Sequence, residues 1–514
     1  MKCSLERICL FRAVALLDAA RGLFSRSRFG RLIHADAAQP ILTIFGRLRA
    51  RAVYEKAVQD CPAYRDFDTR EGGAGIPAVT TKANYIQKYA VAERCYNGRI
   101  PVGAVIDESS GSSGTPNQWV RGPGDRGDAH HALQNSYRTV FGRVGGVGRE
   151  RERILLNCFA LGPWATGMSV SAALADVAIL KSVGPESDKL ENALRCFGPD
   201  YDYVVFGYPP FLKDFLDRTT IDLSNYRLDL VVGGEGMTER VRERLLCRCR
   251  SVLSSYGASD LDINVALETP LSVALRKRCA TDAALCRSLF DRDYPPMIFQ
   301  YNPLDYGIET LPSGELAFTV ARLDSAAPKI RYNLHDLGGT FSAWELTRRL
   351  AARGIPAEEL TAVPHSALPF LYVWGCGDMT VPFYGAKVFP SDMDEIIAGD
   401  AQLAAGIHSF QIAAREDEEG NRRLCIALES ARGATFAAEQ DELRDLFFDA
   451  LCRVNQDFRA VSPLFGRGSV EVRVYPFGEG PFAGGDMRIK NRYVGSLPAA
   501  VPLTTAPVHA HDLL

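Results

Sequence analysis

The sequence predicts an α/β protein with one large domain followed by a smaller α+β domain. The chain has 514 residues, more than the roughly 100 to 200 residues of an ordinary single domain. Between residues 150 and 260, apolar strand-like runs alternate with amphipathic helices, which is typical of a mostly parallel sheet covered by helices. After a strand at residues 370–374 the pattern becomes a self-contained α+β unit, so the domain boundary is expected at Asp378.

The composition is that of a globular chain. Hydrophobic residues make up 46% and charged residues 24%, close to the averages of folded proteins. The formal net charge is -3, without a block of like charges, so nucleic-acid binding is not indicated. The 13 cysteines lack the spacing of a zinc site, and no secretory signal precedes them. We therefore expect reduced thiols, a cytoplasmic location and no structural metal.

The first 95 residues are expected to be largely helical. Residues 8–18 are apolar, but Arg12 and Asp18 interrupt them well short of the roughly 20 apolar residues that a membrane span requires. An amphipathic surface helix fits this run, packed on its own domain or touching a membrane or a partner. Residues 45–95 are expected to be helical, and residues 106–124 to form a loop.

Two strand–loop–helix units define the cleft that the predicted sheet should carry. Strand 203–206 precedes a helix after Pro209-Pro210, and strand 228–232 precedes a helix at 238–249. Ligands bind where the strands of such sheets end in loops. The loops 207–209 and 233–236 are therefore expected to be cleft walls.

The residues after Asp378 predict the smaller domain element by element. The expected order is a strand at 388–389, a helix at 391–397, strands at 409–414 and 424–428 joined by a charged turn, a helix at 438–451 and a strand at 470–475.

The most specific local pattern is a loop rich in serine and glycine. Its hydroxyls and flexible backbone alternate, so that donors can converge on phosphate oxygens. It is not a Walker A loop, because no Gly-Lys-Ser/Thr follows, and its composition alone would equally suit a linker. The order Ser109-Ser110-Gly111-Ser112-Ser113-Gly114-Thr115-Pro116 is similar to the phosphate loop of the adenylate-forming (ANL) superfamily.

Three further motifs follow in the order of that superfamily. Tyr256-Gly257-Ala258-Ser259-Asp260 resembles its YGxTE motif, whose last carboxylate helps to hold Mg²⁺. Residues 331–338 are similar to its RYxxGDxG motif, in which an aspartate, here Asp336, binds the ribose hydroxyls of ATP. Gly375-Cys376-Gly377-Asp378, followed by Phe389-Pro390-Ser391-Asp392, looks like its hinge region.

The resemblance is to the phenylacetate–coenzyme A ligase and CapK-like branch, because residues 295–301 and 314–316 precede the Arg331-Tyr332-Asn333 motif. It covers roughly residues 45–495. It implies a large ATP-binding domain, 1–378, and a small C-terminal lid, 379–514, that swings about a hinge at Asp378. It also implies ATP-dependent activation of a small, aromatic or otherwise apolar carboxylic acid as acyl-AMP, with release of pyrophosphate, and transfer to coenzyme A.

The resemblance assigns roles to individual residues. Asp260 would hold Mg²⁺, and Lys490 would be the catalytic lysine of the lid, although a surface lysine fits its flanking sequence equally well. Three residues depart from the family: Asp260 replaces a longer glutamate, His335 replaces the glycine before the ribose-binding aspartate, and Cys376 replaces an arginine whose charge-assisted contact is usually worth about 1.5 to 3 kcal/mol. The implied ATP-binding residues are Ser109, Ser110, Gly111, Ser112, Ser113, Gly114, Thr115, Tyr256, Gly257, Asp336 and Cys376.

The implied acyl-binding residues stand where predicted strands end. Core packing explains the aromatic ones almost as well, and Glu235 could face a cationic substrate or cap the helix that begins near Thr238. These residues are Trp164, Phe206, Tyr208, Gly233, Gly234 and Glu235.

Two alternatives to a coenzyme A ligase stay open. The acyl-AMP could pass to an amine or another nitrogen nucleophile, or to a carrier-protein thiol acting in trans, because nothing in the sequence identifies a coenzyme A pocket. A non-catalytic nucleotide-binding relative is the other alternative, motivated by Cys376, Asp260 and the loosely matched Lys490. The oligomeric state is not indicated.

Overall fold

The structure is a computed structural model of the chain. The chain divides into two compact units, one of described residues up to 376 and one of described residues from 381 onwards. The expected boundary and hinge residue, Asp378, lies outside the described residues. These residues are 10–16, 38–73, 76–109, 117–141, 152–162, 165–234, 236–292, 294–360, 366–376, 381–383, 386–416, 422–434, 440–455, 458–459, 462 and 465–483.

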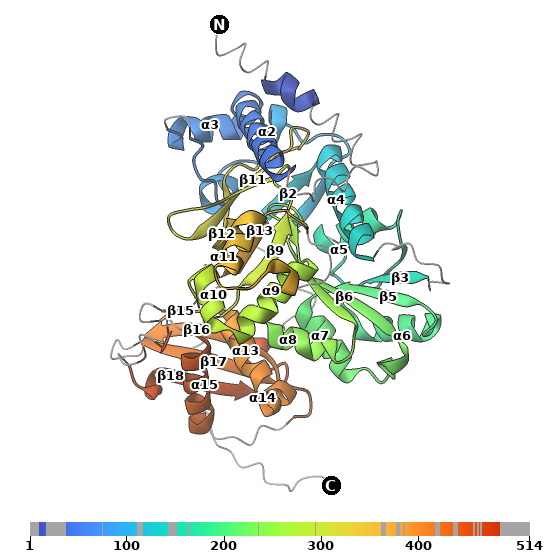
Figure 1. The fold of residues 1–514 in the computed structure, drawn as a ribbon, viewed down its shortest axis with the longest axis vertical. Helices are drawn as coiled ribbons and strands as arrows, with labels where there is room; N and C mark the ends of the chain where they lie inside the picture. Colours follow the sequence, from blue (N-terminus) through green and yellow to red (C-terminus); the bar gives the residue numbers. More distant parts are fainter. Residues whose placement is uncertain are drawn as a thin grey trace, which may run out of the picture. The chain divides into compact units, whose positions relative to one another are not determined.

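A mixed sheet of eleven described strands runs through the first unit, in the order β10-β11-β12-β13-β9-β8-β7-β6-β5-β3-β4 (Figure 1). Its parallel part confirms the alternation predicted for residues 150–260. The strands are β3 (Arg153–Asn157), β4 (Ile179–Ser182), β5 (Asp202–Gly207), β6 (Arg227–Gly233) and β7 (Ser251–Tyr256), and the helices between them are α5 (Ala165–Leu174), α6 (Ser187–Phe197), α7 (Pro209–Arg218) and α8 (Glu239–Leu246).

The other part of the sheet is antiparallel. Antiparallel neighbours need no helical crossover, so the helix–strand alternation that identifies the parallel part is missing from this part of the sequence. The strands are β8 (Ala266–Leu267), β9 (Met297–Tyr301), β10 (Tyr306–Thr310), β11 (Glu315–Val320), β12 (Tyr332–Phe341) and β13 (Phe370–Cys376), and the helices are α9 (Pro270–Thr281), α10 (Ala283–Phe290), α11 (Ala343–Ala351) and α12 (Ala357–Leu360).

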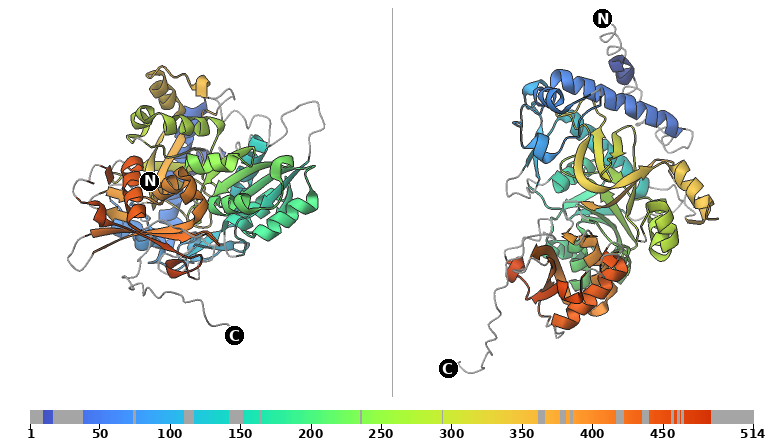
Figure 2. Two further views of the ribbon diagram at one scale, coloured as in Figure 1. Left: turned by 90° about the horizontal axis from the view of Figure 1, so that it is seen from below. Right: turned by 90° about the vertical axis from the view of Figure 1, so that its left-hand side faces the viewer.

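The N-terminal segment is helical only in part. Residues 10–16 are helical, α2 spans Gln39–Asp60 and α3 spans Pro62–Glu71, and Figure 2 shows α2 as the long blue helix. The expectation of helix up to residue 95 is wrong, because only short turns at Lys82–Ile86 and Tyr96–Gly98 follow α3. Instead Thr80 pairs with β12: its carbonyl accepts from the Asn333 amide at 2.8 Å, and this tertiary pairing outweighs local propensity.

The expected loop at 106–124 is also partly wrong, because its flanks form an antiparallel hairpin. Strand β1 (Val105–Ser109) pairs with β2 (Asn117–Arg121), and α4 (Pro123–Phe141) follows. Ser109 lies opposite Asn117, so the two described ends of the serine- and glycine-rich loop meet at the tip of this hairpin. Residues 110–116 themselves lie outside the described residues.

The second unit has each element predicted for it. Its three-stranded sheet has the order β16-β17-β18, with β17 and β18 parallel. Asp392 accepts a hydrogen bond from the Phe389 amide at 2.8 Å and so closes the start of α13. The elements are β14 (Val381–Phe383), β15 (Ala386–Val388), α13 (Pro390–Gly399), α14 (Ala401–Gly406), β16 (Ile407–Glu416), β17 (Arg422–Ser430), α15 (Gln440–Val454) and β18 (Val470–Tyr475), with short turns at Leu223–Asn225 in the first unit and at Arg467–Ser469 and Gly480–Phe482 here.

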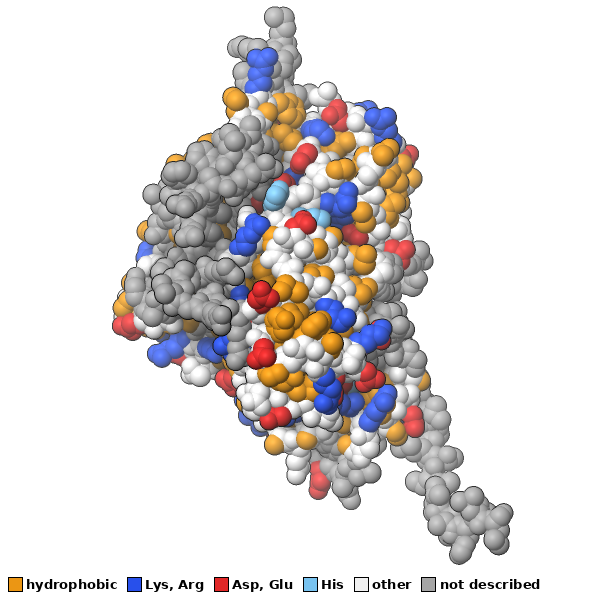
Figure 3. All heavy atoms as spheres, turned by 90° about the vertical axis from the view of Figure 1, so that its right-hand side faces the viewer, with side chains coloured by type: hydrophobic (Ala, Val, Ile, Leu, Met, Phe, Trp, Pro, Cys, Tyr) orange, Lys and Arg blue, Asp and Glu red, His pale blue; other side chains and the backbone are white. Residues whose placement is uncertain are grey.

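The surface agrees with the balanced composition. On the face shown in Figure 3, basic and acidic side chains are interspersed with apolar ones. No helix among the described residues is long and apolar enough to cross a membrane.

Candidate active site

The ends of the adjacent strands β12 and β13 and of β7, which lies three positions from β13 in the sheet, carry three of the predicted nucleotide residues. Tyr256 ends β7, and its hydroxyl donates to Asp336 Oδ2 on β12 at 2.5 Å. Asp336 lies directly opposite Cys376 on β13. The Tyr256 ring is held by stacking on Phe318, with ring centroids 6.0 Å apart. The Asp336 carboxylate is therefore oriented by a side chain from a strand 80 residues away.

The residue before Asp336 has an unusual backbone conformation. His335 has a φ of 64°, the left-handed region that costs most residues other than glycine roughly 1 to 2 kcal/mol. Two contacts hold it there: its amide donates to Asn333 Oδ1 at 2.6 Å, and its Nδ1 lies 3.3 Å from Glu315 Oε1. His335 thus adopts the left-handed backbone conformation that glycine takes most readily.

A closed turn follows Tyr256. The Ala258 amide donates to the Asp262 carbonyl at 2.9 Å, and the Val265 amide donates to the Tyr256 carbonyl at 2.8 Å. A Cβ atom on Gly257 would lie 2.3 Å from the Ile263 carbonyl oxygen. The predicted nucleotide residue Gly257 therefore has a structural reason to be glycine, because the backbone approaches it too closely for any side chain.

We expect Gly257→Ala to destabilise the first unit by roughly 1 to 3 kcal/mol, because the turn must open to admit a methyl group. Urea unfolding followed by fluorescence would measure the change. The matched control is Gly127→Ala, since Gly127 lies inside α4 with open space around its Cβ position and alanine favours a helix. Equal effects of the two substitutions would contradict the close approach.

Asp260, the predicted metal ligand, is buried, with 4% of its surface exposed. Its Oδ2 accepts from the Tyr332 hydroxyl at 3.1 Å and pairs with Lys82 Nζ at 2.9 Å. Lys82 was missed from the sequence. Its only local signal is the capping box formed by Thr81 and Asn84, which indicates the start of a turn but not the distant carboxylate that the lysine reaches.

Tyr332 also connects Asp260 to the serine- and glycine-rich loop. Its ring meets Trp119 of β2 edge to face, with centroids 6.0 Å apart, and Trp119 stands two residues after the loop's described end at Asn117. Burial and the neighbouring Asp260 raise the pKa of the Tyr332 hydroxyl, so it stays protonated and donates. The base of the loop and the Asp260 carboxylate therefore share one aromatic side chain.

A buried charge cluster supports the same turn from behind. Asp262 accepts from Arg322 Nη1 and from the Tyr306 hydroxyl, each at 2.7 Å. Arg121 donates to the carbonyls of Ser259 and Leu261. Burial alone would raise the pKa of Asp262, but Arg322, Lys329 and Arg121 outweigh burial and lower it to about 2. The turn that carries Asp260 is thus fixed to β2 by charge-assisted bonds.

The predicted acyl-binding residues that the structure describes gather around Phe159, which was missed from the sequence. Phe206 is buried in the same core cluster, and the Tyr208 ring meets Phe159 edge to face at 5.0 Å. Gly233 ends β6 with its Cβ position 3.6 Å from the Phe159 ring, and Gly234 has a φ of +83°.

Besides residues 110–115 of the serine- and glycine-rich loop, four predicted site residues lie where the structure gives no account. Trp164, Glu235, Asp378 and Lys490 lie outside the described residues. The end of α8 that Glu235 was expected to cap is capped by Thr238, whose Oγ1 accepts from the Val241 amide at 3.3 Å. Within the described parts of the chain, no three His, Cys, Asp or Glu side chains cluster as a metal site, and the cysteines there are free.

One curated enzyme is similar in sequence to this chain. No family model matches the sequence. The phenylacetate-coenzyme A ligase of Pseudomonas putida is 24% identical over 303 residues, which are 58% of this chain and 60% of that enzyme. The chain therefore aligns with less than two thirds of the length of this relative.

The chain also matches solved structures at low sequence identity. An open conformation of 2-hydroxyisobutyryl-CoA ligase in complex with 2-HIB-AMP and CoA is 14% identical, with 88% of this chain and 90% of that chain covered and a TM-score of 0.48. The amide bond synthetase McbA from Marinactinospora thermotolerans is 15% identical, with 74% and 67% covered and a TM-score of 0.43. The chain is thus similar in sequence to the phenylacetate-coenzyme A ligase of Pseudomonas putida over about three fifths of that enzyme's length.

Proposed function

We propose that this protein activates a carboxylic acid with ATP and transfers the acyl group to coenzyme A. The observation that carries the proposal is the hydrogen bond from Tyr256 to Asp336, which pairs with Cys376 across β12 and β13, with Asp260 on the turn that follows Tyr256. The name of the curated relative, a coenzyme A ligase, supports coenzyme A as the acceptor. The free cysteines of the described residues suit the cytoplasmic location that we propose with it.

The reaction has two steps. A carboxylate oxygen of the acid attacks the α-phosphorus of ATP, and the bond to pyrophosphate breaks. The thiolate of coenzyme A then attacks the acyl carbon and AMP leaves. In the first step Asp336 accepts hydrogen bonds from the ribose, the hydroxyls and amides of residues 109–115 hold the phosphates, and Lys490 from the lid neutralises charge at the α-phosphate.

The residues present fit a magnesium ion that arrives with the nucleotide. Magnesium in such sites takes one or two carboxylates, and phosphate oxygens and waters complete its shell. Asp260 is one such carboxylate, and both of its described bonds are made to Oδ2, so Oδ1 is left for the ion. When bound, the ion would offset the charge on the phosphates. Lys82 supplies positive charge at the same carboxylate.

The test is acid-dependent ATP–pyrophosphate exchange by the purified full-length chain, followed by mass spectrometry of the product with and without coenzyme A. We expect exchange with at least one acid and an acyl-CoA product. Exchange without an acyl-CoA product would favour an amine or a carrier-protein thiol as the acceptor. Nucleotide binding without exchange on a broad panel of acids would refute the proposed activity and favour a non-catalytic relative.

We expect Cys376→Arg to tighten ATP binding by about 10- to 100-fold. Residue 376 pairs with Asp336 in the sheet, and an arginine at the matching family position would add a charge-assisted contact to a ribose or phosphate oxygen of ATP. Calorimetric titration with ATP measures the change. Cys376→Met is the control, because it adds length without charge. Unchanged or weaker ATP binding by the arginine variant would show that the hinge motif is placed wrongly.

A further inference from the structure

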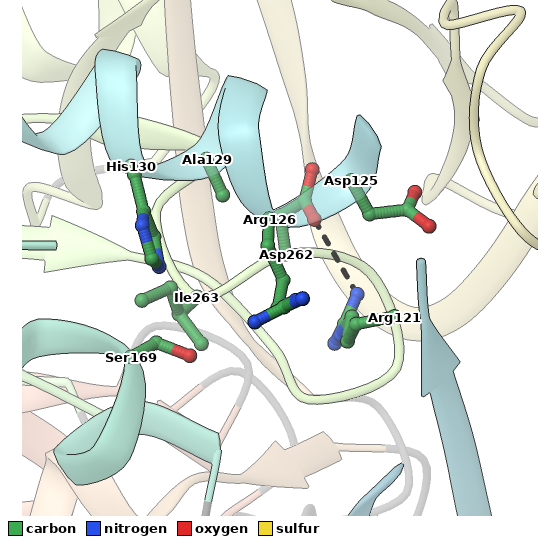
Figure 4. Close-up of a pocket in the computed structure, with 8 residues that line it drawn as sticks. All are labelled: Arg121, Asp125, Arg126, Ala129, His130, Ser169, Asp262 and Ile263. Carbon is green, nitrogen blue, oxygen red and sulfur yellow. Dashed lines mark hydrogen bonds and ion pairs between the residues drawn. The ribbon is translucent and has the colours of Figure 1, made fainter. Parts of the chain in front are cut away.

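A small pocket is lined in part by Asp262 and Ile263, which follow Asp260 in the chain. It is formed between α4, the start of α5 and residues 262–263, and its volume of about 20 Å³ is room for about one water molecule or a polar group of that size. Figure 4 shows Arg126 and His130 projecting from α4 towards Ile263, with Ser169 of α5 facing them. The lining residues are Arg121, Asp125, Arg126, Ala129, His130, Ser169, Asp262 and Ile263.

Three of the charged lining residues are already committed to partners. Arg121 pairs with Asp107 and with Asp262, and Asp262 also pairs with Arg322 at 2.7 Å. Asp125 Oδ2 accepts from the backbone amides of Gly122 and Ala326, each at 2.8 Å. These groups form the walls of the pocket, and their described hydrogen bonds and ion pairs are made within the protein.

Arg126 is different, because no carboxylate among the described residues forms an ion pair with it. Its Nη2 donates to the Gly103 carbonyl at 2.7 Å, while its Nε is buried without a hydrogen-bond partner in the described part of the chain. A buried unsatisfied donor on a charged group is costly, and a ligand anion would remove that cost. The pocket therefore presents an uncompensated guanidinium.

The other two polar side chains suit the same kind of ligand. Burial and the nearby Arg126 lower the pKa of His130, so the ring is neutral near pH 7 and offers one N–H donor and one acceptor. The Ser169 hydroxyl lies across the pocket from it (Figure 4) and can donate as well. Two or three donors thus converge on a space that holds one oxygen-bearing group.

The pocket is within reach of the proposed reaction site. Ile263 follows Asp260 by three residues, so their Cα atoms are at most about 11 Å apart. Ile263 also packs against the cluster that contains Phe159, Phe206 and Tyr208. An acid whose reacting carboxylate lies at the Asp260 turn and whose chain passes these apolar side chains would place its other end near Arg126.

We propose that this pocket binds a second anionic group of the acid substrate, so that the preferred substrate is a small dicarboxylic acid and not the wholly apolar acid expected from the sequence. The proposal rests on the proposed acid-activating function. Arg126 binds the far carboxylate, His130 and Ser169 orient it, and the aromatic cluster around Phe159 contacts the methylene chain between the two carboxylates.

The experiment compares straight-chain acids of equal length that carry one or two carboxylates, from four to seven carbons, in ATP–pyrophosphate exchange. We expect at least one dicarboxylic acid to have a higher kcat/KM than the monocarboxylic acid of the same length. Arg126→Met should lower the ratio of the two kcat/KM values, dicarboxylic over monocarboxylic acid, at least tenfold, mainly by raising KM for the dicarboxylic acid. Arg126→Lys should restore part of this ratio. Arg244→Met removes an exposed arginine that pairs with Asp217 and should leave the ratio unchanged.

The outcomes separate this inference from the proposed function. The inference is overturned if monocarboxylic acids have the higher kcat/KM in exchange. It is also overturned if Arg126→Met changes exchange equally for both kinds of acid. In either case the proposed acid activation is not contradicted. If no acid supports exchange, the proposed function fails. Calorimetric titration with glutarate in the presence of ATP then tests separately whether the pocket binds a dicarboxylate. Glutarate binding that is lost in Arg126→Met supports the pocket, and no binding to the unaltered protein overturns it.

Discussion

Replacing Asp336 by asparagine is expected to reduce acid-dependent ATP–pyrophosphate exchange by about 100-fold or more. The proposed role of this carboxylate is to accept hydrogen bonds from two ribose hydroxyls, and a hydrogen bond to a charged group contributes about 1.5 to 3 kcal/mol. Losing two of them corresponds to a factor of roughly 100 to 10,000 in kcat/KM. Because Asp336 is only partly buried, the variant should remain folded.

Tyr256→Phe is the comparison for this variant. It removes the hydroxyl that donates to Asp336 Oδ2 but keeps both the carboxylate and the aromatic stacking on Phe318. We expect about a tenfold loss, since only the orientation of the carboxylate is relaxed. If Asp336→Asn retained more than a tenth of the exchange rate while its ATP affinity was unchanged, Asp336 would not be the ribose ligand.

Replacing Asp262 by asparagine is expected to cost about 3 to 5 kcal/mol of stability. Asp262 is buried beside Arg322, Arg121 and Lys329, and removing one partner from a buried ion pair leaves an uncompensated charge out of water. Chemical unfolding of the first unit measures this loss. Asp217→Asn, at an exposed ion pair with Arg244, should cost less than about 1 kcal/mol.

The same carboxylate predicts a dependence of stability on pH. The folded pKa of Asp262 is about 2, below the ordinary value of about 3.9, so folding favours its ionised form. Its contribution, about 2.6 kcal/mol, is complete above about pH 5 and is lost as the pH falls towards 2 and below. The stability difference between the unaltered protein and Asp262→Asn should shrink over that range, and a constant difference would show that Asp262 does not titrate in this way.

Local patterns predicted the elements that depend on local interactions. The parallel part of the sheet, both strand–loop–helix units and the second unit were recognised because their apolar periodicity and turn residues lie within short windows. The helical expectation for residues 72–95 failed because Thr80 there pairs with β12, a preference that no short window contains. The hairpin of β1 and β2 was missed because serine and glycine in its connecting loop dominated the composition of the whole segment.

The sequence by itself determined the order of four motifs, and hence the adenylate-forming resemblance, because each motif is a run of adjacent residues. Only the tertiary structure decided what those residues contact. Lys82 forms an ion pair with Asp260, 178 positions away in the sequence. Arg121 donates hydrogen bonds to carbonyls of the turn at 259–262. Phe159 packs in one cluster with Phe206 and Tyr208. Arg126 became a candidate for substrate recognition for the same reason. Its uncompensated charge is a property of the groups packed around it, and packing between distant segments is set by sheet register and burial, which sequence spacing does not record.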